Sequence, residues 1–160
     1  MNKIKIGIDI GVKNFSLCIN ENDIVSQYIL LNLIDGKDII KKIKKVYDEF
    51  ILKYIGENVE INIEKQVTNA TINCYIQYIL ETILYLNNVK YRLINPELKY
   101  RNLKLIYNID RIIKSQLKKY IEIDITKSVK YTLENNVFIA SNSQIKKYDD
   151  LIDAYILSCL

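Results

Sequence analysis

Hydrophobic and polar residues alternate along this chain with two different periods, which predict where its strands and helices lie. In residues 3–10, lysines and isoleucines alternate before the run becomes continuously apolar around Asp9, as is typical of a strand in the middle of a sheet. Gly11 then suits a tight turn. Similar short patterns predict four more strands, at residues 15–19, 24–33, 59–64 and 91–94.

Apolar residues spaced three and four positions apart predict helices between and after these strands. Ile39, Ile43, Val46 and Phe50 form one such stripe, and lysines occupy the opposite face. The predicted helices cover residues 37–54, 70–87, 109–120, 125–135 and 149–160. This order of elements predicts an α/β domain with a mixed sheet of five strands. Neither a linker nor a repeat divides the chain, so we expect residues 1–160 to form one domain.

The composition excludes several kinds of chemistry. The chain has no His, which excludes Ser-His-Asp and Cys-His catalysis and histidine-ligated zinc. Its 3 cysteines are isolated, so we expect reduced thiols rather than a disulfide framework or a zinc knuckle. The first residues lead directly into a strand and no apolar run is long enough to span a membrane. We therefore expect a soluble intracellular protein with no membrane partner.

Positive charge is concentrated in one segment. The net charge of the chain is +4, but residues 99–130 contain nine basic and three acidic residues and so carry +6, which leaves −2 for the rest. Such a segment suits contact with a polyanion. A lysine-rich helix face in water would have the same composition, so both interpretations stay open at this point.

Several acidic residues lie where a hydrophobic core has no use for them. Asp9 is inside the apolar first strand, and Glu64 ends the strand at 59–64. Asp149, Asp150 and Asp153 can all approach one face of the last predicted helix. Each has a structural alternative, because a strand-end aspartate can cap a turn and acids in a first helical turn stabilise the helix dipole.

The combination of these acids suits a two-metal site. Carboxylates from two strands and a helix can hold two cations about 4 Å apart, of which one activates a water molecule and the other stabilises the leaving oxygen. Magnesium and manganese prefer oxygen ligands and need no histidine. The pattern therefore predicts a metal-dependent phosphodiesterase.

Three motifs carry a resemblance to a known family. They are Gly7-Ile8-Asp9-Ile10-Gly11-Val12-Lys13-Asn14-Phe15, Ile63-Glu64-Lys65-Gln66 and Lys147-Tyr148-Asp149-Asp150-Leu151-Ile152-Asp153-Ala154. In them the chain resembles the RuvC branch of the RNase H-like superfamily, and within it the poxviral and yeast-mitochondrial Holliday junction resolvases. The resemblance implies an RNase H-like α/β fold, in which a mixed five-stranded sheet has helices on both faces.

The resemblance also implies an active site. The metal-binding acids would be Asp9, Glu64, Asp150 and Asp153, which would hold two Mg²⁺ ions, with Mn²⁺ as a substitute. The family uses a lysine from the segment before the last helix near the scissile phosphate, and we expect it to be Lys119. Contacts with nucleic acid are expected from Lys13, Asn14, Lys118 and Lys127.

Members of this family act as homodimers that make paired symmetric nicks in four-way DNA junctions. The apolar helix from Ile72 to Leu84 is our candidate for the dimer interface. The small size and a composition rich in isoleucine, lysine and asparagine suit a poxvirus or another large DNA virus. We would then expect the protein in the host-cell cytoplasm, where it would resolve viral DNA concatemers.

Other functions share some of these features. An RNase H-type nuclease that cuts RNA–DNA hybrids would have the same acidic site, and a catalytically inactive relative would still bind nucleic acid. The retained acids argue against the inactive relative, because convergent negative charges weaken DNA binding. An actin- or sugar-kinase-type ATPase also has a D-x-G strand and turn, but only Gly36 and Gly56 follow Gly11, too few for its second phosphate loop.

Overall fold

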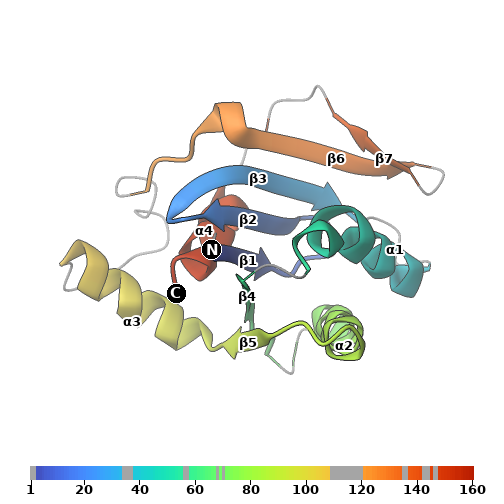
Figure 1. The fold of residues 1–160 in the computed structure, drawn as a ribbon, viewed down its shortest axis with the longest axis horizontal. Helices are drawn as coiled ribbons and strands as arrows, with labels where there is room; N and C mark the ends of the chain where they lie inside the picture. Colours follow the sequence, from blue (N-terminus) through green and yellow to red (C-terminus); the bar gives the residue numbers. More distant parts are fainter. Residues whose placement is uncertain are drawn as a thin grey trace.

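The computed structural model describes residues 3–33, 38–55, 58–67, 69, 71–108, 121–134, 137–141, 145 and 148–160 (Figure 1). The strands are β1 (Lys3–Asp9), β2 (Phe15–Glu21), β3 (Ile24–Asn32), β4 (Asn58–Glu64), β5 (Tyr91–Ile94), β6 (Ser128–Glu134) and β7 (Val137–Ala140). The α-helices are α1 (Ile39–Val46), α2 (Thr71–Leu86), α3 (Pro96–Tyr107) and α4 (Asp149–Ser158). A π-helical turn at Tyr47–Ile51 and a 3₁₀ turn at Leu52–Tyr54 continue α1, and another 3₁₀ turn, Ile125–Lys127, precedes β6.

The strands form one mixed sheet in the order β5-β4-β1-β2-β3-β6-β7. β2 is antiparallel to both of its neighbours, β1 and β3, while β4 pairs in parallel with both β1 and β5. On the other side, β6 pairs in parallel with β3, and β7 is antiparallel to β6. The predicted mixed α/β fold is therefore confirmed, but the prediction of five strands was wrong, because the described residues form seven.

The two additional strands lie at and after the segment for which a helix was predicted, residues 125–135. Ile125, Val129 and Leu133 are spaced four apart, which favours a helix. Alternate residues from 129 to 133 are also apolar, and β-branched and aromatic side chains in the segment favour a strand. The segment forms β6, and the short β7 then pairs with it as the edge of the sheet.

A second difference is α3. The dipeptide Asn95-Pro96 predicts the end of a strand. Proline is also favoured in the first turn of a helix, because backbone N–H groups there have no hydrogen-bond acceptor within the helix. α3 begins at Pro96. The helix predicted at 109–120 lies outside the described residues. The other predicted elements are confirmed within two residues at each end. Among the described helices, none is long and apolar enough to cross a membrane.

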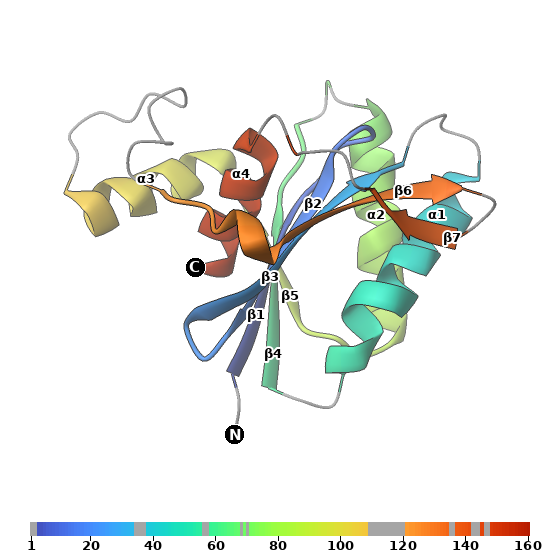
Figure 2. The same cartoon turned by 90° about the horizontal axis from the view of Figure 1, so that it is seen from above.

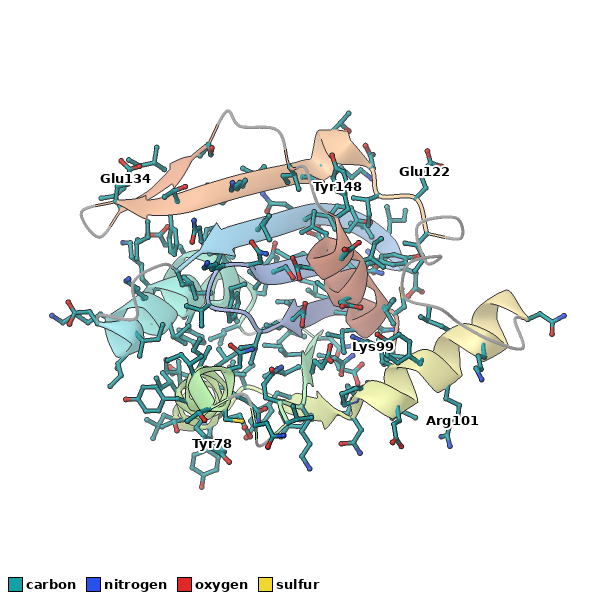
Figure 3. The ribbon with its side chains drawn as sticks, turned by 180° about the vertical axis from the view of Figure 1, so that it is seen from behind. Tyr78, Lys99, Arg101, Glu122, Glu134 and Tyr148 are labelled. Atoms are coloured by element: carbon teal, nitrogen blue, oxygen red, sulfur yellow. The ribbon has the colours of Figure 1, made fainter. Side chains whose placement is uncertain are left out.

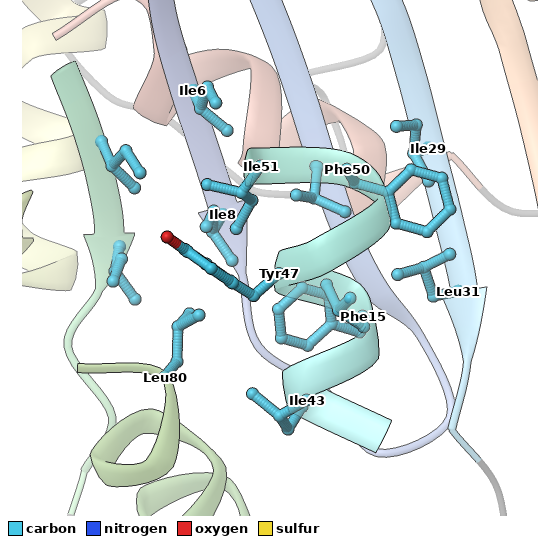
Figure 4. Packing of buried hydrophobic residues seen from close by; sticks show 14 of the residues in the cluster. Ile6, Ile8, Phe15, Ile29, Leu31, Ile43, Tyr47, Phe50, Ile51 and Leu80 are labelled. Atoms are coloured by element: carbon cyan, nitrogen blue, oxygen red, sulfur yellow. The ribbon is translucent and has the colours of Figure 1, made fainter. Parts of the chain in front are cut away.

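Helices cover both faces of the sheet. Figure 2 shows α1 and α2 on one face and α3 and α4 on the other. The main core lies between the sheet and the first pair, where Ile43, Tyr47 and Leu80 pack against the strands (Figure 4). In β1 the even-numbered isoleucines belong to this core. Because side chains alternate along a strand, the odd-numbered residues of β1 face α4.

Gly7 allows α4 to lie directly on β1. A Cβ atom at this position would be 2.0 Å from Ala154 O and 2.5 Å from Ser158 N. Only a residue without a side chain can therefore occupy the position while the helix backbone keeps its place. Packing alone therefore requires Gly7 in the first-strand motif, independently of the role of Asp9.

Two buried hydrogen bonds hold α4 in register on the sheet. Ser16 Oγ, from β2, donates to Asp150 O at 2.7 Å, and Asn62 Nδ2, from β4, donates to Leu157 O at 2.9 Å. Both side chains are fully buried, so these bonds satisfy groups that would otherwise be costly to remove from water. The amino-terminal end of α4 is thereby fixed to β2 and its carboxyl-terminal end to β4.

We predict that Gly7→Ala destabilises the protein by about 2–3 kcal/mol, because the added methyl group forces α4 away from β1. Urea unfolding followed by circular dichroism measures this change. Lys3→Ala, at an exposed position of the same strand, is the control and should change the free energy of unfolding by less than about 0.5 kcal/mol. Equal stability of Gly7→Ala and the wild type would contradict the close packing of α4.

Candidate functional site

The carboxyl ends of β1 and β4 bring two acids together. Asp9 is the last residue of β1 and Glu64 the last of β4, and the two strands pair in parallel with the preceding residues in register. Gly7 and Asn62, two residues before the acids, both contact α4. Since side chains two residues apart share one face, Asp9 and Glu64 also lie on the α4 side of the sheet.

α4 supplies the remaining acids. Asp149 and Asp150 lie in its first turn, and Asp153 follows one turn later with only 2% of its surface exposed. A favourable helix dipole accounts for acids in a first turn. It does not account for a buried carboxyl group further along, which needs a partner of opposite charge.

The electrostatics of Asp9 show that the four acids act on one another. Burial, and after it the nearby charges of Glu64, Asp153 and Asp150, raise the pKa of Asp9 from 3.8 to about 8, although Lys99 lowers it in part. At neutral pH the folded protein therefore holds Asp9 largely protonated. A cation at this place would allow the carboxyl group to ionise, which is the behaviour expected of a metal ligand.

Lys99 is the basic residue that the structure adds to this cluster. Its Nζ atom lies 2.5 Å from Glu64 Oε2 and 3.1 Å from Asp153 Oδ1, and 1% of its side chain is exposed. Figure 3 shows Lys99 on α3 close to α4. Burial alone would lower the pKa of Lys99, but the carboxylates of Asp153 and Glu64 hold it above its usual value. The lysine is therefore a buried ammonium ion between two of the acids.

The position of α3 explains this contact. β5 pairs with β4, with Ile94 opposite Glu64, and α3 begins two residues later at Pro96. The first turn of the helix consequently passes beside the end of β4. In the sequence, Lys99 is only one of nine basic residues between positions 99 and 130. The dipeptide Asn95-Pro96 signals the start of a helix directly after a strand, and this signal could have identified Lys99 as a residue near the site.

The donor set suits a divalent cation, although its carboxylates are not arranged around one. Four carboxyl groups are hard oxygen ligands of the kind that Mg²⁺ and Mn²⁺ prefer. Within the described part of the chain, no group of three or more Asp, Glu or Cys side chains surrounds a common point closely enough to hold a metal ion. The Lys99 ammonium lies between Glu64 and Asp153, where it supplies positive charge to both.

Three of the five other residues predicted for the site lie in the described part of the chain. Lys13 and Asn14 are exposed in the turn that follows the strand of Asp9. Lys127 lies beside the beginning of β3, where its Nζ donates to Val25 O at 2.9 Å. Lys118 and Lys119 lie outside the described residues, so their predicted roles stay predictions.

Replacing Asp9 by Asn should stabilise the metal-free protein at neutral pH. Between the usual pKa of 3.8 and the folded-state value of about 8, the folded chain binds one proton more than the unfolded chain. Its free energy of unfolding therefore falls as pH rises through this window, by on the order of 1 kcal/mol per pH unit. In EDTA we expect Asp9→Asn to have a higher Tm than the wild type at pH 7.5 and a similar Tm near pH 4.

Glu60→Gln is the matched control for this measurement. Glu60 lies on β4, on the same face as Glu64, but its Oε1 atom is 2.6 Å from Arg92 Nη2 in a partly exposed ion pair. Its loss should lower the free energy of unfolding by at most about 1 kcal/mol. A lower Tm for Asp9→Asn than for the wild type at pH 7.5 would contradict the raised pKa.

Comparison with known proteins identifies the fold. No protein-family model and no curated protein sequence matches the chain. The solved structure of the yeast mitochondrial Holliday junction resolvase Ydc2 aligns with a TM-score of 0.57 and 17% identity over 98% of this chain and 77% of that one. RuvC from T. thermophilus, in complex with a Holliday junction substrate, aligns with a TM-score of 0.57 and 8% identity over 98% and 90%. A further Thermus thermophilus RuvC structure has a TM-score of 0.55 and 12% identity over 97% and 90%. The resemblance that the three motifs indicated is confirmed for the fold: the chain has the fold of the RuvC-type Holliday junction resolvases.

Proposed function

We propose that the chain is a Holliday junction resolvase, which makes paired symmetric, metal-dependent nicks in four-way DNA junctions. The observation that carries the proposal is the convergence of Asp9, Glu64, Asp150 and Asp153 at one edge of a RuvC-type sheet. A surface that only binds DNA gains nothing from four neighbouring negative charges. Phosphodiester cleavage uses such carboxylates to hold divalent cations. T. thermophilus RuvC was crystallised with a Holliday junction substrate, which supports the same substrate class here.

The four carboxylates would hold two Mg²⁺ ions, for which Mn²⁺ can substitute. Ions bound there would supply an activated water molecule and stabilise the leaving oxygen. The chain contributes fixed positions for the ligands. Asp9 and Glu64 end two paired strands, and Asp153 lies on a helix whose backbone rests on Gly7. The depth of Asp9 and Asp153 in the protein limits the access of bulk water to this site.

Lys99 is our candidate for the lysine that faces the scissile phosphate, since its ammonium group touches two of the acids. Lys119, which the sequence predicts for this role, stays the alternative. Lys13 and Asn14 follow directly on the strand of Asp9, and we propose that they contact the DNA backbone. Lys118 and Lys127 are the further contacts with DNA that we propose.

The exposed side of α3 is the proposed approach for the DNA. Arg101 and Lys104 are exposed on the helix that carries Lys99, and Figure 3 shows Arg101 directed away from the sheet. Phosphate contacts of this kind supply affinity without sequence readout and make binding strongly dependent on salt. The biological setting that we propose is recombination or concatemer resolution during replication of an AT-rich viral genome.

A homodimer is the proposed assembly, with α2 at its interface. Tyr75 and Tyr78 on α2 are 45% and 64% exposed, and Ile40 on α1 is 56% exposed. They line an apolar groove of about 420 Å³ between the two helices. A second copy of the chain would cover this surface and place two sites on one junction, as paired nicks require.

Tyr78→Glu tests the assembly, because a charge in the groove opposes burial against a second copy. We expect the wild type to be a dimer and Tyr78→Glu to be a monomer in light scattering coupled to size exclusion. Ile24→Glu, at a 67% exposed residue at the start of β3, should leave the dimer intact. A monomeric wild type at concentrations of about 100 µM would contradict an interface at α2.

Incision of a labelled synthetic four-way junction tests the function. With Mg²⁺ we expect symmetric nicks near the branch point, and each of the four Asp→Asn or Glu→Gln variants should lose at least about 100-fold in rate. Junction binding in EDTA should be preserved or tighter, because each variant removes a negative charge from the path of the phosphate. The four substitutions are Asp9→Asn, Glu64→Gln, Asp150→Asn and Asp153→Asn.

Glu60→Gln is again the control and should stay within about twofold of the wild-type rate. An RNA–DNA hybrid and a plain duplex are the substrate controls. Cleavage of the hybrid alone would move the protein to the RNase H branch with the same site. No metal-dependent cleavage of any substrate would contradict the proposed function.

A further inference from the structure

The ion pairs of Lys99 connect three elements at the candidate metal site. Its ammonium group, from α3, is 2.5 Å from Glu64 Oε2 at the end of β4 and 3.1 Å from Asp153 Oδ1 on α4. The exposed fractions of the three side chains are 1% for Lys99, 17% for Glu64 and 3% for Asp153. These contacts are therefore not a surface ion pair, which would contribute little to stability.

The energetics of burial make each partner depend on the others. An ionised group removed from water is stable only when opposite charge and hydrogen bonds replace its hydration. Without Lys99, Glu64 and Asp153 would lose the ammonium group that lies between their charges. Without the two acids, the Lys99 ammonium would be an isolated charge in the protein interior.

A divalent cation at the same acids would compete with Lys99. The oxygens that the ammonium group contacts belong to two of the four proposed metal ligands. Two cations at hydrogen-bonding distance from the same carboxylates repel each other, and more strongly at a buried site than in water. A metal ion that takes Glu64 Oε2 and Asp153 Oδ1 as its ligands must therefore displace the ammonium group.

We infer that Lys99 is a built-in counter-ion that a divalent metal must displace, and that displacement makes its ammonium group available to an anionic phosphate. The inference rests on the proposed metal site and adds a switch to it. In the metal-free protein Lys99 holds β4, α3 and α4 together. In the metal-loaded protein it becomes a positive group beside the metal site, available to a phosphate that reaches the acids.

Metal binding without DNA tests the inference. In calorimetric titrations with Mn²⁺, Lys99→Met should bind the ion about tenfold more tightly than the wild type, because the competing charge is gone. The Tm of the variant in EDTA should be lower than that of the wild type, because the acids have lost their counter-ion. Lys104→Met removes the same charge from an exposed position of α3 and should leave both quantities nearly unchanged.

Acetylation of the wild-type protein provides a second test that does not depend on the folding of a variant. In EDTA the buried Lys99 should be protected from an amine-acetylating reagent, and saturating Mn²⁺ should increase its modification, as measured by mass spectrometry. The exposed Lys104 should react equally in both conditions. Equal protection of Lys99 with and without bound Mn²⁺ would overturn the inference.

The outcomes separate this inference from the proposed function. Weaker or unchanged Mn²⁺ binding by Lys99→Met, in a protein that still nicks four-way junctions, would overturn the counter-ion role and leave the resolvase intact. Tighter Mn²⁺ binding by Lys99→Met, together with a wild-type protein that cuts no junction, would support the counter-ion role and overturn the resolvase. Binding of Mn²⁺ to neither protein would overturn the counter-ion role.

Discussion

The contact between the backbone of α4 and Gly7 of β1 is the constraint on which the site depends. The distance from a would-be Cβ atom to Ala154 O, 2.0 Å, leaves no room for any other residue. This contact and the bonds from Ser16 and Asn62 fix the helix over the ends of β1 and β4. Asp153 is consequently held beside Asp9 and Glu64, although about 90 residues separate it from the nearer of them in sequence.

The cost of bringing these acids together explains the other features of the site. Burial and mutual repulsion raise the pKa of Asp9 to about 8, so the metal-free protein retains a proton there. Lys99 offsets part of the remaining charge through Glu64 and Asp153. The protein tolerates an arrangement that is unfavourable for stability, as functional sites commonly require. In the proposed resolvase, stability, metal binding and access for a phosphate would thus be linked through the same few charges.

Local patterns in the sequence predict the acids but not their counter-ion. Asp9 stands out because it lies inside an apolar strand, and Asp153 because it follows the first helical turn among apolar residues. Glu64 ends an alternating strand, where an acid is ordinary, and only its combination with the other acids singles it out. Lys99 does not stand out, since its burial depends on the path of the chain after β5. The pattern at 125–135 fits both a helix and a strand, and pairing with β3 decides between them. Long-range contacts therefore determine what the sequence alone leaves ambiguous.

The most direct test of the central claim is the position of Mn²⁺ in crystals of the wild-type protein, read from anomalous scattering. The account predicts a peak within bonding distance of the carboxylates of Asp9 and Asp153, with the Lys99 ammonium moved away from them. Ordered Mn²⁺ only at other places, or an Asp9 carboxyl group without metal at saturating Mn²⁺, would contradict the claim that these acids form a metal site.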